Sequence, residues 1–253
     1  MARELRITLI GGPTALFEVD GLRLLTDPTF DPPSEFQGAV TLTKTAGPAL
    51  SREQVGRVNA VLLSHDQHFD NLDHSGRDYL KSAPMTVTTT AGAGRLGGNS
   101  HGLEPWQSAK IGDTNWTVTA TPARHGPAGI EPISGDVTGF VLSDPQDTPL
   151  IYFTGDTVWH DGIVAIAQRF QPKVAVVFAG GAQARGPFYL TMDTNDVVET
   201  ARYFPNAAIV PIHHDGWKHF TQSQQDLELT FKALKIENRL HPIHPGETVT
   251  LPL

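Results

Sequence analysis

Imidazole and carboxylate side chains are concentrated between residues 62 and 77, in the stretch LLSHDQHFDNLDHSGR. Three histidines and three aspartates stand there, directly after an apolar run. Neutral imidazoles and ionised carboxylates are the ligands that proteins offer to zinc, manganese and iron. The stretch therefore indicates a metal site.

Four predicted strands each carry such a side chain at their carboxyl end. In chain order these are AVLLS before His65 and His68, WTVTATPA before His125, LIYFTG before Asp156 and AIVPI before His213. If the strands lie side by side, their ends meet at one rim of a sheet and the side chains form one cluster. A bound metal ion lowers the pKa of a water molecule there, and Asp156 suits a position between two ions.

The elements that must position this cluster change in character along the chain. Asp20-Gly21 separates two apolar runs and predicts a hairpin. Ser51 begins a capping box, and a further helix is predicted over residues 74–83, with Asp73 as its cap. The glycine-rich residues 91–106 are interpreted as a loop. Antiparallel strands dominate first and strand–helix alternation follows, which predicts one α/β domain over residues 1–253.

Composition excludes several kinds of protein. Lys and Arg number 19 against 27 Asp and Glu, and this net charge of −8 argues against a nucleic-acid partner. The chain has no cysteine, so no disulfide or thiolate ligand can form. No run approaches the roughly 20 apolar residues of a membrane span, and the N-terminus does not read as a signal peptide. We therefore expect a cytoplasmic protein.

The order of the motifs resembles the metallo-β-lactamase superfamily of metal-dependent hydrolases. The segments that carry the resemblance are ITLIGGPTALFEVDGLRLLTDPTF, LLSHDQHFDNLD, TPARHG, YFTGDT and PIHHDGWKHF. The most similar branch is the one that includes L-ascorbate-6-phosphate lactonases and N-acylphosphatidylethanolamine phospholipases D. The resemblance implies a four-layer αβ/βα sandwich, in which two mixed β-sheets lie face to face with helices outside.

The resemblance also implies which side chains bind metal. Its ligand set has three histidines for a first ion, and two aspartates and a histidine for a second: His65, His68 and His125, then Asp70, Asp156 and His213. The family ligand stands in a Pro-x-His sequence, which favours His213, and the adjacent His214 remains the alternative.

The metal loop departs from the family pattern His-x-His-x-Asp-His in two ways. One extra residue separates His65 from His68, and Asn71 stands where the second ion would find a histidine. If the loop bulges, Asp66 becomes an additional ligand, whereas Asn71 offers only a weak amide oxygen. The second site is then either weaker or suited to a harder ion such as manganese. We expect one or two zinc or manganese ions per chain.

Two further positions bear on the site. Asp27 matches a family aspartate and is predicted to orient a metal-binding histidine by accepting its other N–H group. Related proteins often carry a histidine after the first glycine of the opening hairpin, where this chain has Gly12.

The function implied is attack of a metal-bound hydroxide on a lactone or other ester of a small molecule. Asp70 orients the hydroxide and passes a proton to the leaving group. His219 either donates a hydrogen bond to the substrate or packs beside Trp217, and Arg185 either pairs with a phosphate or carboxylate or is solvated. A phosphodiester substrate, a non-catalytic metal-dependent binding protein and a di-iron redox protein remain alternatives, and the sequence leaves an oligomer open.

Overall fold

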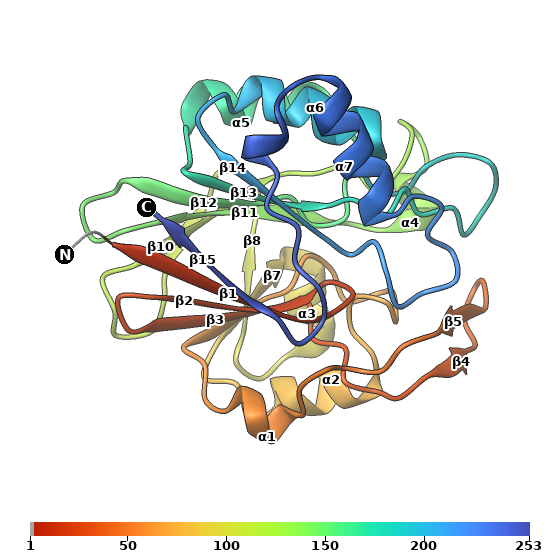
Figure 1. The fold of residues 1–253 in the computed structure, drawn as a ribbon. Helices are drawn as coiled ribbons and strands as arrows, with labels where there is room; N and C mark the ends of the chain where they lie inside the picture. The colour runs from red at the N-terminus through yellow and green to blue at the C-terminus, as the bar shows by residue number, and fades with distance from the viewer. Residues whose placement is uncertain (1–2) are drawn as a thin grey trace.

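Two β-sheets lie face to face between two layers of helices in the computed structural model, which describes residues 3–253 (Figure 1). The first sheet runs in the order β15 (Thr248–Pro252), β1 (Glu4–Gly11), β2 (Thr14–Val19), β3 (Leu22–Thr26), β6 (Ala60–Leu62), β7 (Thr86–Thr89) and β8 (Ser100–Leu103). The second runs in the order β14 (Ala208–Ile212), β13 (Val174–Phe178), β12 (Pro149–Phe153), β11 (Thr138–Ser143), β10 (Thr117–Pro122) and β9 (Ser108–Lys110). The four-layer sandwich is thereby confirmed.

Each sheet is antiparallel in one half and parallel in the other. In the first sheet the change comes at β3, which pairs antiparallel with β2 and parallel with β6. In the second it comes at β12, between antiparallel β11 and parallel β13. The strand–helix alternation predicted for the later part of the chain corresponds to the parallel half of the second sheet.

Helices cover the outer face of each sheet (Figure 1). Beside the first sheet lie α1 (Arg52–Val55), α2 (His74–Leu80) and α3 (Thr90–Leu96). The remaining helical segments are α4 (Glu131–Ser134), α5 (Asp161–Arg169), α6 (Thr194–Tyr203), α7 (Gln224–Ala233) and the 3₁₀ turn η1 (Glu237–Arg239). A separate hairpin of β4 (Ser34–Phe36) and β5 (Leu42–Lys44) extends to one side.

Three apolar clusters hold these layers together. The central cluster lies between the sheets, where the rings of Phe17 and Phe153 meet edge to face with centroids 4.8 Å apart. A second cluster joins the second sheet to α5, α6 and α7, and a third joins the first sheet to α1 and α2. Each fully buried aromatic ring contributes about 3–5 kcal/mol relative to alanine, so the sheets form a rigid base for the strand ends.

Several local predictions are confirmed. Asp20 and Gly21 both have positive φ, as a tight two-residue turn between β2 and β3 requires. The side chains of Ser51 and Gln54 form the capping box of α1. Asp73 caps α2 by accepting a hydrogen bond from the Gly76 amide at 2.8 Å.

The interpretation of residues 91–106 as a loop was wrong. The segment contains most of α3 and all of β8, because Thr89 caps the helix and the glycines permit close packing. A Cβ atom at Gly102 would lie 2.6 Å from the Cα atom of Thr90, inside contact distance. Gly102 therefore lets β8 approach α3.

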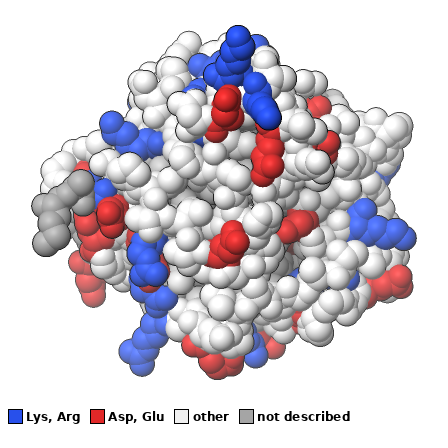
Figure 2. Space-filling view, in the orientation of Figure 1, with Lys and Arg blue, Asp and Glu red and all other residues white. Residues whose placement is uncertain are grey.

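Charged side chains of both signs are interspersed on the face shown in Figure 2. Among residues 3–253, none of the helices has the length and apolar character needed to cross a bilayer.

Candidate metal centre

The predicted donors meet at one end of the sandwich, where strands of both sheets finish. His65 and His68 follow β6 of the first sheet, and His125, Asp156 and His213 follow β10, β12 and β14 of the second. Two groups form in which the donor atoms lie within 4.8 Å of one another. We call His65, His68 and His125 the imidazole trio, and Asp70, Asp156 and His213 the carboxylate trio.

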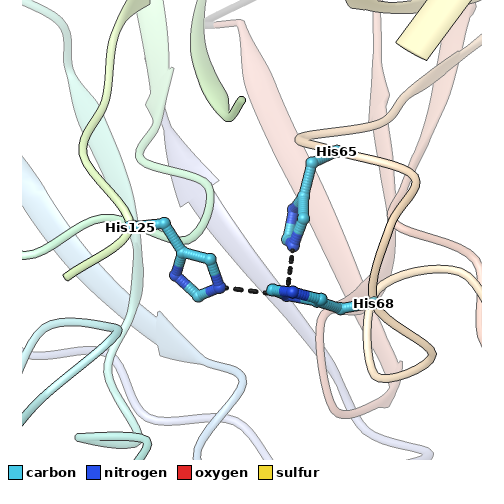
Figure 3. Close-up of side chains that lie close together, drawn as sticks. All are labelled: His65, His68 and His125. Atoms are coloured by element: carbon cyan, nitrogen blue, oxygen red, sulfur yellow. Dashed lines mark hydrogen bonds between the residues drawn. The ribbon is translucent and has the colours of Figure 1, made fainter. Parts of the chain in front are cut away.

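Three ring nitrogens converge in the imidazole trio (Figure 3). His68 Nδ1 lies 3.0 Å from His65 Nε2 and 3.1 Å from His125 Nε2. One nitrogen cannot donate a proton to one neighbour and accept from the other at the same time, so hydrogen bonding alone does not satisfy this arrangement. Three converging lone pairs fit a metal ion such as Zn²⁺.

Hydrogen bonds on the far side of two rings fix their orientation. His125 Nδ1 donates to the Leu190 carbonyl oxygen at 2.8 Å, which leaves the Nε2 lone pair free for a metal. His65 Nδ1 lies 2.9 Å from Ser64 Oγ, which in turn donates to Asp27 Oδ1 at 2.6 Å. Asp27 was expected to accept directly from a histidine; the structure inserts the Ser64 hydroxyl between them.

The carboxylate trio lies beside the imidazole trio, and Asp156 faces both. Asp156 Oδ1 is 3.3 Å from His213 Nε2, and its Oδ2 is 3.7 Å from His125 Nε2. Asp70 Oδ2 lies 3.7 Å from His213 Nε2. Asp70 Oδ1, Asp156 Oδ2 and His213 Nε2 are buried without a hydrogen-bond partner among residues 3–253. Buried polar atoms left in this way fit a cation, so the residues present suit the two-ion site.

Neighbouring charges set the protonation of these groups. Burial, the largest single effect, would raise the pKa of Asp156, but the surrounding imidazoles, His213 foremost, together outweigh it and the pKa lies below the usual value. For Asp70, burial is again the largest single effect, but the hydrogen bond from His219 and the surrounding imidazoles together outweigh it and lower the pKa. Burial, and then the nearby His125, lower the pKa of His68 to about 4. The site therefore offers ionised carboxylates and a neutral His68 ring near pH 7.

The structure gives Asp66 and Asn71 other partners. Asp66 forms an ion pair with Arg95, whose Nε lies 2.9 Å from Asp66 Oδ2, and stands outside both trios. The expectation that it becomes a ligand is therefore corrected. Asn71 Nδ2 donates to Asp156 Oδ1 at 3.2 Å and faces Ser64 Oγ at 3.4 Å. In this orientation the amide nitrogen of Asn71 holds Asp156 in place, and its Oδ1 is buried without a hydrogen-bond partner among residues 3–253.

His219 contacts the site directly. Its Nε2 lies 2.9 Å from Asp70 Oδ2, while its Nδ1 is buried without a partner in the described chain. The ring also lies 6.1 Å from that of Trp217, as the packing alternative expected, and a hydrogen bond to the substrate stays a prediction. His214 is buried but belongs to neither trio.

Trp217 accounts for the glycine at position 12. A Cβ atom on Gly12 would lie 3.3 Å from the indole Nε1 atom of Trp217. The Gly12 carbonyl oxygen also accepts a hydrogen bond from the His213 amide at 2.9 Å, which supports the left-handed backbone of His213, with φ of 57°. Sequence reasoning missed this packing, although the tryptophan stands only four residues after the predicted ligand.

A small pocket opens beside both trios, with about 310 Å³ of empty space up to its open mouth. Its lining combines His68, Asp70, His125 and His219 with the apolar Val40, Leu42, Ala182, Ala184 and Leu190 and with Arg185. A wider hollow on the other side of His125 contains none of the other five trio residues. The small pocket, which three trio residues line, is therefore the candidate substrate pocket.

A buried ion pair fixes the hairpin that supplies one wall of this pocket. Lys44 Nζ, at the end of β5, donates to Asp73 Oδ2 at 3.0 Å and to the Thr29 carbonyl oxygen at 3.1 Å. Both charged side chains are almost fully buried. Removing one partner of a buried pair costs about 3–5 kcal/mol, so the hairpin is held firmly against the body of the protein.

Comparisons with known proteins agree with this geometry. The beta-lactamase superfamily domain matches residues 22–214. A UPF0173 metal-dependent hydrolase of Methanosphaerula palustris is 30% identical over 64% of this chain and 71% of its own length. Another, of Herpetosiphon aurantiacus, is 24% identical over 97% and 98%. The crystal structure of isothiocyanate hydrolase from Delia radicum gut bacteria has a TM-score of 0.85 at 24% identity, covering 98% of this chain and 99% of that one.

A domain match across most of the chain and relatives of nearly the same length identify the family. The protein belongs to the beta-lactamase superfamily and, within it, to the UPF0173 metal-dependent hydrolases.

Proposed function

We propose that this metal-dependent hydrolase cleaves a lactone or another carboxylic ester of a small molecule. The observation that carries the proposal is the meeting of both trios at Asp156, beside a pocket with largely apolar walls. Two adjacent donor sets suit a reaction in which water attacks an acyl carbon and negative charge develops on its oxygen.

The donor atoms suggest which ions bind. Three imidazole nitrogens suit zinc, and a set of two carboxylates with one imidazole suits zinc or the harder manganese. When bound, such ions act as Lewis acids and lower the pKa of a water molecule. Asp156 lies between the two trios and is the residue best placed to contact both ions.

Asp70 and His219 handle the proton. His219 Nε2 donates to Asp70 Oδ2 and thereby holds the carboxylate. Asp70 Oδ1 has no hydrogen-bond partner among residues 3–253. The carboxylate of Asp70 orients the attacking water and relays its proton to the leaving alcohol. The buried Nδ1 of His219 is available to a polar atom of the substrate.

The test combines metal analysis with a substrate panel. Protein purified without added metal is analysed for bound ions and then assayed on γ-butyrolactone, a 4-nitrophenyl ester, an isothiocyanate and a phosphodiester. The isothiocyanate is included because a protein of similar fold is named as its hydrolase. We expect turnover of a lactone or ester that Asp70→Asn reduces at least about 100-fold, since general acid–base catalysis contributes that much.

Two outcomes would contradict the proposal. Turnover of the phosphodiester alone would identify a phosphodiesterase. Stoichiometric metal without turnover of any member of the panel would support the non-catalytic binding protein.

A further inference from the structure

Arg185 differs from the other partly buried arginines in having no internal partner. It lies in the segment between β13 and α6, where its side chain helps to line the small pocket. The partly buried arginines elsewhere in residues 3–253 all donate to a carboxylate or carbonyl oxygen: Arg3, Arg23, Arg77, Arg124 and Arg239. Among residues 3–253, the guanidinium of Arg185 takes part in no hydrogen bond and no ion pair.

The surroundings make this unpaired charge informative. Ala182, Ala184 and Leu190 line the pocket from the same segment as Arg185, and Val40 and Leu42 line it from the hairpin. The guanidinium of Arg185 is only partly buried and is free to meet a ligand, and the apolar walls beside it would strengthen its attraction for an anion. The five donors of a guanidinium match the oxygens of a carboxylate or phosphate.

The one carboxylate that lines the pocket is already committed. Asp70 is held by His219 and belongs to the carboxylate trio, and it forms no ion pair with Arg185. The pocket therefore presents donors for metal on one side and a free positive charge on another. A ligand that spans the pocket meets both.

We propose that Arg185 is a specificity-determining residue that binds an anionic group, carboxylate or phosphate, on the substrate. This inference rests on the proposed ester hydrolysis and narrows it to small lactones or esters that carry such a group a few bonds from the scissile carbonyl. The anion pairs with Arg185, and the carbonyl is thereby directed toward the two trios.

The test uses a matched pair of substrates that differ in charge and hardly in shape. One is γ-butyrolactone with a carboxylate on the ring carbon next to the ring oxygen, and the other is its primary carboxamide. A third lactone, with a phosphorylated hydroxymethyl group at the same carbon, separates phosphate from carboxylate recognition. Metal-loaded wild type is compared with Arg185→Met, Arg185→Lys and the control Arg57→Met, an exposed arginine outside the pocket.

We expect wild type to prefer one of the anionic lactones over the carboxamide. Arg185→Met should lower that ratio of kcat/KM about 10- to 100-fold, mainly through KM, because a hydrogen-bonded charge contributes on that scale. Arg185→Lys should retain part of the preference, and Arg57→Met all of it. If Arg185→Met leaves the ratio of kcat/KM between the anionic lactone and the carboxamide unchanged, the proposal is overturned. This holds whether both values of kcat/KM fall together or neither falls.

A binding measurement separates failure of this inference from failure of the proposed reaction. Calorimetric titration of the lactone carboxylate and carboxamide into each protein needs no turnover. Tighter binding of the carboxylate that disappears in Arg185→Met, without hydrolysis of any lactone, would retain the anion subsite and refute lactone hydrolysis. If the carboxylate and the carboxamide bind equally well to wild type, and also equally well to Arg185→Met, the proposed anion subsite is overturned.

Discussion

The imidazole trio and the carboxylate trio are adjacent, but different forces position them. In the imidazole trio, the rings are turned by hydrogen bonds on their far sides, from His65 toward Ser64 and from His125 to the Leu190 carbonyl. In the carboxylate trio, the ionised Asp70 and Asp156 face the imidazole of His213. The Asn71 amide donates a hydrogen bond to Asp156, and His219 donates one to Asp70. The imidazole trio is thus shaped by geometry, whereas the carboxylate trio depends on a balance of charge.

Carboxylates elsewhere in the protein sharpen this contrast. Burial raises the pKa of Asp196 to about 6 and that of Asp27 to about 7. Asp70 and Asp156 are buried as deeply as Asp27, and yet imidazoles on several sides lower their pKa values. The neighbours of a buried carboxylate, and not its depth, decide whether it can serve as a metal ligand at neutral pH.

The largest effect is expected from Asp156→Ala, because this residue faces both trios. Loss of Lewis-acid catalysis at both ions costs several kcal/mol in the barrier, so kcat/KM should fall at least about 1000-fold. Elemental analysis should show metal lost from both positions. Asp113→Ala, which removes an exposed aspartate, is the matched control. Full metal content in Asp156→Ala would show that the two trios are independent.

His68→Ala should separate the trios. It removes the ring whose Nδ1 faces both other imidazoles, so the ion of the imidazole trio should be lost while that of the carboxylate trio remains. Activity should fall at least about 100-fold, since one Lewis acid is removed.

Metal titration of the purified variant measures this directly, with the exposed His244→Ala as control. Simultaneous loss of both ions in His68→Ala would mean that the carboxylate trio cannot bind metal alone.

Ser64→Ala tests the hydrogen bonds behind the imidazole trio. The substitution leaves His65 Nδ1 without its acceptor while every metal ligand remains in place. Loss of such a supporting partner typically lowers metal affinity about 10- to 100-fold. Competition with a chelator should detect the change at the imidazole trio, with Ser108→Ala on β9 as control. Unchanged affinity would show that packing alone orients His65.

Much of this site could be predicted from the sequence, because the position of each donor depends on the few residues of the strand before it. A strand that ends on a histidine or aspartate predicts both the position and the chemistry of that residue. Asp73 and Ser51 could likewise be recognised as helix caps, since a cap depends on residues only three positions away.

Contacts between distant segments could not be predicted. Ser64 carries no sign that Asp27, 37 residues earlier, will accept its proton. The pairing of Asp66 with Arg95 and the packing of Trp217 against Gly12 depend on how the sheets bring distant loops together. The glycine at 102 misled for a related reason, since its small size serves packing between β8 and α3.

The smallest effect is expected outside both trios, at Asp196 on α6, a carboxylate that has no imidazole partner among residues 3–253. Its pKa in the folded protein, about 6, lies above the unfolded value, so the folded state binds the proton more tightly. The stability it contributes is present at low pH and is lost as pH rises through about 6. Between pH 4 and 7, the free energy of unfolding of wild type should therefore fall by about 1 kcal/mol relative to that of Asp196→Asn, after allowance for solvent screening.

Urea unfolding of both proteins at pH 4.5, 6 and 8 measures this difference, and Asp113→Asn controls for an exposed carboxylate. Parallel stability profiles for wild type and Asp196→Asn would mean that burial does not perturb this residue. The lowered pKa values of Asp70 and Asp156 would then need an explanation other than their imidazole neighbours. If the profiles diverge as expected, a carboxylate without such neighbours takes up its proton on burial, and the surrounding histidines are what keep the metal-site aspartates ionised.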